Sequence, residues 1–135
     1  MQPASNQHEY AGQQEYAEEL DALVAAPKHH VLLFENDRVR VLDTTVAPGE
    51  TVPLHTHRWP ATLYILSWSD FLRRDGEGEV VVDSRAAGFA PAVGSAVWTE
   101  PLAPHTLENV GNADLHAISV EIKGCQWTLQ RSTVE

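Results

Sequence analysis

The stretch Pro53-Leu-His-Thr-His-Arg-Trp-Pro-Ala-Thr-Leu-Tyr-Ile-Leu66 places two histidines one residue apart. In a β-strand, side chains at positions i and i+2 point to the same face, so His55 and His57 project together if residues 51–57 are extended. Imidazole is a good ligand for divalent Fe, Zn, Cu and Ni, and two such ligands need at least one more. The pair alone also fits two polar side chains on a solvated sheet face.

A second histidine segment lies some fifty residues further on, in Trp98-Thr-Glu-Pro-Leu-Ala-Pro-His105-Thr-Leu-Glu-Asn109. The two segments together resemble the two motifs of the cupin superfamily. The first motif is G-x5-H-x-H-x(3,4)-E-x6-G, and its first three fixed positions are matched by Gly49, His55 and His57. The resemblance covers about residues 30–123, with both motifs in the right order.

The second cupin motif, G-x5-P-x-G-x2-H-x3-N, is matched at both ends by Gly94, His105 and Asn109. Its proline and glycine positions hold Glu100 and Leu102 instead.

The first motif also departs from the pattern, because its metal-binding glutamate would fall at Ala61 or Thr62. The resemblance therefore implies a three-histidine metal site of His55, His57 and His105, without a carboxylate.

Three neutral imidazoles leave a bound ion its full double charge, and three protein ligands leave positions open for water or substrate. Some cupin dioxygenases hold Fe(II) with three histidines. The resemblance implies one divalent transition-metal ion per chain, with Fe expected first and Zn, Ni, Mn or Cu as alternatives.

Two functions fit this site. The first is a mononuclear non-haem Fe(II) dioxygenase-like enzyme that acts on a small organic molecule. The alternative is a non-enzymatic cupin that binds or senses a small molecule with a degenerate metal site. The sequence leaves open whether the protein is an enzyme.

The rest of the chain supports an all-β fold, because short β-rich runs alternate with turn residues from residue 30 onward. The resemblance implies a small single-domain cupin (RmlC-like), a double-stranded β-helix or jelly-roll barrel over residues 29–135. Residues 1–28 read as an N-terminal extension. Within them, helical spacing of apolar residues predicts an amphipathic helix over residues 13–26, ended by Pro27.

An apolar pocket is expected around the histidines. Alternation places Thr51 and Pro53 on the same face as the two motif histidines. The cupin register turns three residues of the next strand inward, and they are Ala61, Leu63 and Ile65.

Trp59 lies in the short Arg58-Trp-Pro60 turn directly after His57. It is expected at the pocket mouth, or as a rim or dimer-contact residue.

Alternation also sends either Arg73 or Arg74 inward. An arginine inside an apolar pocket would bind a carboxylate through its planar fork. Two solvated charges at the edge of a hairpin are the alternative, and the sequence slightly favours it.

Four other histidines are weaker candidates for metal ligands. His29 and His30 are adjacent, so in an extended segment they point to opposite faces and cannot chelate one ion together. His116 lies on the last long strand, where a sheet position is expected, and His8 lies near the N-terminus. None of these four is included in the predicted site.

Charge limits the partners. The chain of 135 residues has 9 basic and 19 acidic side chains and a net charge of −10, so nucleic acid and anionic membranes are poor partners. It has one cysteine, no signal-peptide pattern and no long apolar run. A cytoplasmic protein is therefore expected, and the resemblance implies a homodimer with a small-molecule ligand or substrate.

Overall fold

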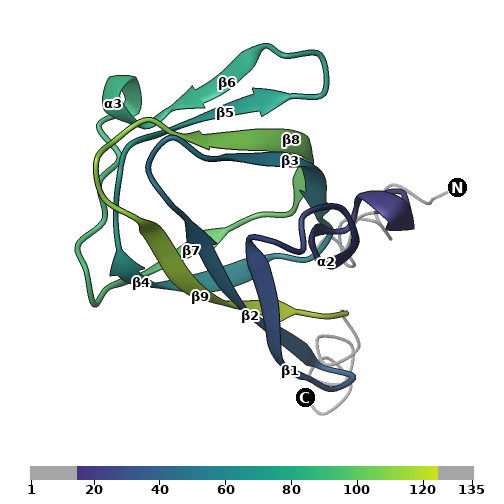
Figure 1. The fold of residues 1–135 in the computed structure, drawn as a ribbon. Helices are drawn as coiled ribbons and strands as arrows, with labels where there is room; N and C mark the ends of the chain where they lie inside the picture. The colour runs from purple at the N-terminus through teal and green to yellow at the C-terminus, as the bar shows by residue number, and fades with distance from the viewer. Residues whose placement is uncertain (1–14, 125–135) are drawn as a thin grey trace, which may run out of the picture.

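The computed structural model describes residues 15–124, which form nine strands in two antiparallel sheets (Figure 1). One sheet has the order β1-β2-β9-β4-β7 and the other β3-β8-β5-β6. The predicted all-β jelly roll is confirmed, and every run that the sequence marks as β-rich contains a strand. The strands are β1 (His30–Glu35), β2 (Val39–Val46), β3 (Thr51–His57), β4 (Ala61–Ser67), β5 (Phe71–Asp75), β6 (Val80–Asp83), β7 (Ala96–Thr99), β8 (Leu102–Asn109) and β9 (Leu115–Ile122).

The two sheets form facing walls (Figure 1). Between them lies a buried apolar cluster of Ala26, Val46, Val52, Phe71 and Leu115. Burying a large apolar side chain contributes about 1.5–3 kcal/mol. The cluster contains residues from both sheets and from the segment before β1, so its packing holds these parts together.

The continuous helix expected over residues 13–26 is not present in the part of the chain that the structure describes, which excludes residues 13 and 14. A 3₁₀ helix, η1 (Glu18–Leu20), and a one-turn helix, α2 (Ala22–Ala25), stand in its place. Asp21 separates them because its backbone is extended (φ −54°, ψ 143°) and forms a bridge with Thr56 of β3. The Asp21 side chain accepts a hydrogen bond from Leu23 N and caps α2.

Strand β3 does not alternate regularly. The pairing of β3 with β8 shifts register between Val52 and His55. Val52 and His55 are buried, whereas Thr51 and Pro53 are exposed. The expectation that Thr51 and Pro53 share the histidine face is therefore wrong, because the register shift between Val52 and His55 changes the alternation before the histidines.

A third helical turn, α3 (Ser84–Ala87), follows β6 and was not predicted. Asp83 caps it by accepting from the backbone N–H groups of Arg85 and Ala86. None of the helices in residues 15–124 is long and apolar enough to cross a bilayer.

Asn109, the last residue of the second motif, joins three segments at one end of the barrel. Its Nδ2 donates to Val46 O and Ala113 O, both at 2.8 Å. Its Oδ1 accepts from Ser69 Oγ at 2.8 Å and Gly111 N at 3.0 Å. The side chain is 1% exposed, so these bonds satisfy a buried amide.

Gly111 lies against this network, and we expect Gly111→Ala to destabilise the protein. A Cβ there would overlap Ser69 Oγ and lie 2.9 Å from the Asp70 backbone nitrogen. Overpacking of this kind costs about 1–3 kcal/mol, which corresponds to a fall in melting temperature of roughly 5–15 °C. Differential scanning fluorimetry measures it. Gly76→Ala is the matched control, because no atom lies within 4 Å of its Cβ position; equal melting temperatures for the two variants would contradict the prediction.

Candidate metal centre

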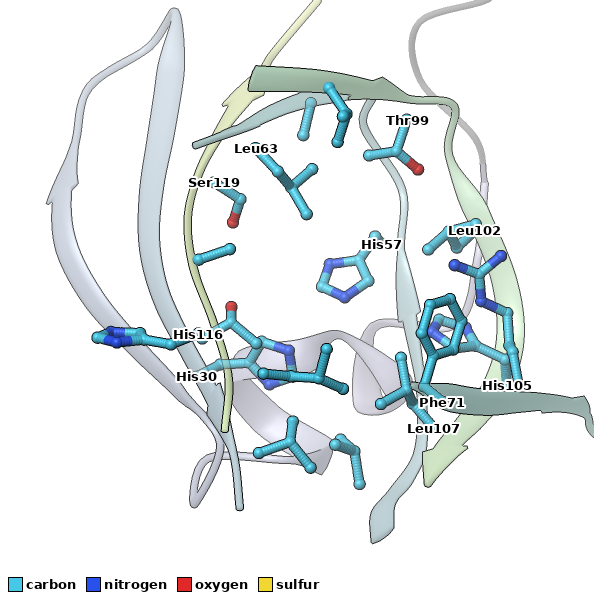
Figure 2. Close-up of a pocket in the computed structure, with 18 of the residues that line it drawn as sticks. His30, His57, Leu63, Phe71, Thr99, Leu102, His105, Leu107, His116 and Ser119 are labelled. Carbon is cyan, nitrogen blue, oxygen red and sulfur yellow. The ribbon is translucent and has the colours of Figure 1, made fainter. Parts of the chain in front are cut away.

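Four histidines from three strands gather in the cavity between the sheets. They come from β1 (His30), β3 (His55 and His57) and β8 (His105). Ligand atoms of His30, His55 and His57 all lie within 4.8 Å of one another. The ring centroid of His105 is 4.2 Å from that of His55 and 5.8 Å from that of His57. Figure 2 shows the rings of His30, His57 and His105 directed into the pocket.

Each of the four rings bonds an oxygen acceptor through Nδ1. His55 Nδ1 lies 2.7 Å from Pro53 O, and His105 Nδ1 lies 2.7 Å from Ala103 O. A carbonyl oxygen only accepts, so Nδ1 must carry the proton in both rings. The lone pair of a neutral imidazole then lies on Nε2.

The other two histidines have the same pattern. His30 Nδ1 lies 3.0 Å from Ala26 O, and His57 Nδ1 lies 3.1 Å from Glu121 Oε2. Metal-binding histidines commonly donate their second N–H to a carbonyl or carboxylate, which fixes the ring orientation. All four rings therefore have the hydrogen bonds of metal ligands that bind through Nε2.

Burial keeps three of the imidazoles, those of His30, His55 and His105, neutral. It lowers the pKa of His30 to about 4, with a further contribution from His57. Burial and the neighbouring His105 and His57 lower the pKa of His55 to about 2. Burial likewise lowers the pKa of His105 to about 3. A neutral ring is the form that binds a metal ion.

A buried ionic network holds one side of the cluster. Glu121 is 1% exposed; its Oε1 accepts from Arg40 Nε at 2.6 Å, and its Oε2 accepts from His57. Arg40 also donates from Nη1 and Nη2 to the two oxygens of Asp21, at 2.9 and 3.0 Å. Burial raises the pKa of Glu121, but hydrogen bonds and charge from His57 and Arg40 outweigh it and leave the pKa below the ordinary value. The carboxylate is therefore ionised beside the histidines.

Glu121 also lies opposite the position that lacks the motif glutamate. In the pairing of β4 with β9, Ala61 faces Glu121 directly. The small side chain of Ala61 leaves room at the wall, and the carboxylate comes from the neighbouring strand. It bonds His57 Nδ1 and Arg40, so it orients a histidine from outside the ligand set.

The cavity has a volume of about 330 Å³ and mostly apolar walls. Of the predicted pocket residues, Trp59, Ala61, Leu63 and Arg73 line it. Ile65 does not, although it was expected to. It is 0% exposed, so its side chain is enclosed by other residues instead of facing the open space.

Trp59 is part of the wall. It is 7% exposed, with the Arg40 guanidinium 5.0 Å and the Arg58 guanidinium 4.5 Å from its ring centroid. Stacking of guanidinium groups on an indole is a stabilising cation–π contact. Trp59 thus packs the cavity wall against the Arg40 network.

The histidines excluded on sequence grounds divide into two kinds. His29 and His30 do point apart: His29 Nδ1 bonds Thr45 O at 3.0 Å, whereas His30 joins the cluster. The adjacency argument did not place His30 in this cluster, because it compared His30 only with His29 and not with the distant motif histidines. The ring of His116 points away from the cavity centre (Figure 2) and bonds Asp43 Oδ1 at 2.9 Å. His8 lies outside the described residues.

A family model described as "Cupin domain" matches residues 42–121, more than half of the chain, so the protein belongs to the cupin family. No curated protein matches it.

Three solved structures are similar to this chain. A cupin domain from Bordetella pertussis is 19% identical, with 70% of this chain and 91% of that one covered and a TM-score of 0.55; at this identity the likeness shows the fold alone. An RmlC-like cupin with a double-stranded β-helix fold from Methanocaldococcus jannaschii is 15% identical, covering 89% and 94%, with a TM-score of 0.49. The polyketide cyclase RemF from Streptomyces resistomycificus is 17% identical, covering 83% and 80%, with a TM-score of 0.46.

Sequence reasoning missed the residues that support the site. Arg40 and Glu121 each interrupt an apolar strand, in Val39-Arg-Val41 and Val120-Glu-Ile122. A charged residue at an inward position of a strand is rarely buried without a partner, and that is the signal that would have found them. Asp21 carried no such signal, because it lies outside the strands.

We expect the metal-free protein to lose stability as the pH falls from about 6.5 to about 4. Unfolded imidazoles bind protons near pH 6.5, whereas folded His30 does so only near pH 4. Below pH 6.5 the unfolded state therefore binds more protons, and the stability present above 6.5 is lost progressively. Each buried histidine contributes up to about 1.4 kcal/mol per pH unit. Urea unfolding with chelator present measures this dependence.

His30→Ala should reduce the slope of the free energy of unfolding against pH by the contribution of about one proton, because one buried imidazole is removed. His116→Ala is the control, since that ring lies beside Asp43 and outside the cluster. A free energy of unfolding that stays constant between about pH 6.5 and pH 5 would contradict the burial of neutral imidazoles.

Proposed function

We propose that His30, His55, His57 and His105 bind one divalent transition-metal ion, and that a small organic molecule reacts beside it. The observation that carries this is the convergence of three buried imidazoles and the partly buried His57, each with Nδ1 already bonded to an oxygen. A cluster kept only for hydrogen bonding would not need four rings with the same free nitrogen.

The donor set suits a transition metal. Imidazole nitrogens favour Fe, Zn, Cu and Ni over Mg or Ca, which prefer oxygen ligands. Two ligands of one ion at about 2.1 Å lie at most about 4.2 Å apart, so the ring atoms of His30, His55 and His57, which lie within 4.8 Å of one another, need only small rotations. The ring centroid of His105 lies 4.2 Å from that of His55. Fe(II) is the ion proposed first. When bound, such an ion would supply a centre that binds O2 or a substrate oxygen.

The protein's own groups prepare the site. Glu121 accepts a hydrogen bond from the Nδ1–H of His57 and so fixes the orientation of that ring. Arg40 and Asp21 hold Glu121 in turn, so its position is fixed before any ligand enters. The apolar walls exclude water around a substrate, which strengthens electrostatic interactions within the cavity.

A second function, small-molecule binding or sensing without turnover, is favoured by one observation. The position of the motif glutamate is occupied by Ala61, and Glu121 opposite is engaged by Arg40 and His57. Oxygen consumption separates the two functions. With Fe(II) bound and a panel of small organic acids, ketones and phenols supplied, an enzyme consumes O2 in proportion to substrate, whereas a binding protein shifts its melting temperature without consuming O2.

We predict about one equivalent of transition metal per chain in untagged protein, measured by inductively coupled plasma mass spectrometry. His30→Ala should weaken metal binding at least about tenfold, as expected for the loss of a direct ligand. His29→Ala is the matched control. His29 is equally buried, at 5% exposed, but bonds Thr45 O on the other side of the strand.

Two results would contradict the metal proposal. One is less than about a tenth of an equivalent of metal, even after reconstitution with Fe(II). The other is equal metal affinity in His30→Ala and His29→Ala, which would remove His30 from the ligand set.

We also propose that the protein is a homodimer that pairs through β1. Four consecutive apolar side chains of this edge strand, residues 31–34, are 45–55% exposed. An edge strand with such side chains is a template for pairing with another strand, and pairing with a second copy is self-complementary about a two-fold axis.

Light scattering should give twice the chain mass for the wild type and a shift toward monomer for Leu33→Glu. Val81→Glu is the matched control, because Val81 is equally exposed on β6, the edge strand of the other sheet. A wild-type monomer at about 100 μM, or a dimer unaffected by Leu33→Glu, would contradict this interface.

A further inference from the structure

Arg73 is a cation on the inner wall of the cavity. In the sheet its Cα partners are Leu107 of β8 and Val82 of β6, and both of these also line the cavity. Directly opposite residues on neighbouring strands share a face, so Arg73 projects inward. The preference for two solvated charges at this hairpin is therefore wrong for Arg73.

Its neighbour Arg74 has the opposite orientation. Arg74 does not line the cavity, and its Nη1 donates to Glu108 Oε1 at 2.9 Å. The two arginines thus provide a matched pair, with one charge paired outside the barrel and the other facing the cavity.

Within residues 15–124, the Arg73 guanidinium has no hydrogen-bond acceptor and no carboxylate partner. Its Nε is buried and unbonded, and its Cζ lies 5.7 Å from the Phe71 ring centroid. Burial lowers the pKa of Arg73, yet a guanidinium stays protonated at neutral pH. Taking a cation out of water without a partner is costly, so a group that pairs with it would recover that cost.

The acids of the site do not meet this need. Glu121 also lines the cavity, but both of its oxygens are engaged, by Arg40 and by His57. A metal ion held by neutral imidazoles would add two further positive charges to the cavity. With such an ion bound, the cavity would be positive inside a chain whose net charge is −10, and it would favour an anion with an apolar body.

We propose that Arg73 binds the carboxylate of a small organic acid whose apolar part fills the cavity beside the histidine cluster. As an assignment of substrate class, this rests on the proposed function of the same site. A planar guanidinium fork pairs bidentately with a carboxylate. One guanidinium matches one negative charge, whereas a phosphate dianion would call for more donors than this wall provides.

The location suits a substrate anchor. His105 lies two residues from Leu107 along β8, on the face that Arg73 shares. His55 is the Cα partner of His105 on the other side of that strand. A carboxylate at Arg73 would thus place the adjoining carbons of a small acid next to the imidazoles, within a cavity of about 330 Å³.

Calorimetric titration of the full-length, metal-free protein with benzoate and butyrate tests the assignment, because a metal ion then cannot hold the carboxylate. We expect at least one of them to bind, and Arg73→Gln to weaken that binding at least about tenfold, as for loss of a charge-assisted bond. Arg74→Gln should bind within about twofold of the wild type. Benzamide, the neutral isostere of benzoate, should bind at least about tenfold more weakly.

Arg73→Lys separates charge from geometry. It should retain part of the affinity, because it keeps the positive charge and loses the fork. The melting temperature of Arg73→Gln should equal or exceed that of the wild type, since an unpaired buried charge is removed. If Arg73→Gln does not fold, the comparison of benzoate with benzamide on the wild type decides the question.

Several results would overturn the assignment. The first is that neither acid binds below about 10 mM, with or without metal. The second is that Arg73→Gln binds the acid as tightly as the wild type, or that benzamide binds as tightly as benzoate. The third is that inorganic phosphate binds more tightly than the acids, which would indicate a general anion site.

Metal uptake, measured after a portion of each metal-free preparation is reconstituted with Fe(II), keeps the two proposals distinct. Arg73-dependent carboxylate binding in a protein that takes up no metal would sustain this inference and refute the metal proposal. A full equivalent of metal with Arg73-independent binding would do the reverse.

Discussion

The structure around the site depends on one buried carboxylate, that of Glu121. It bonds Arg40 on β2 and His57 on β3, and through Arg40 it reaches Asp21 before α2. Removing one member of a buried ionic group typically costs about 3–5 kcal/mol, because the remaining charge loses its partner. The same bonds that close the N-terminal segment onto the barrel thus fix the orientation of a histidine in the cavity. Structural integrity and the geometry of the site are coupled through this carboxylate.

This arrangement differs from the family's usual metal site in where the charge lies. The motif glutamate would bind the ion directly through its negative charge. Glu121 instead accepts a hydrogen bond from Nδ1 of His57, so it would contact the ion only through that histidine. Loss of the carboxylate at Ala61 is accompanied by a fourth imidazole, His30, from a strand outside both motifs. With neutral ligands an ion keeps its full charge and is a stronger Lewis acid. An apolar cavity that also contains unpaired Arg73 then favours anionic ligands.

The sequence predicted the strands well because their signal is local: β-rich runs bounded by Gly, Pro and Asn-Asp turns. The resemblance to the two cupin motifs also implied that His55, His57 and His105 lie close together. It did not predict His30, since nothing local shows that the start of β1 crosses the end of β3. The Arg40–Glu121 bond joins residues 81 positions apart. The helix expected over residues 13–26 is interrupted because Asp21 takes an extended conformation to reach Arg40 and Thr56. These tertiary contacts override the helical spacing of the apolar residues.

We propose that the four imidazoles hold one ion and that Glu121 does not bind it. Anomalous diffraction at the metal absorption edge, from crystals of protein loaded with a single transition metal, distinguishes the two ligand sets. We expect one anomalous peak in the cavity, bonded to Nε2 of His30, His55, His57 and His105, with Glu121 still bonded to Arg40 and to His57 Nδ1. A peak bonded to a Glu121 oxygen, a peak that leaves out His30, or no peak in the cavity would contradict it.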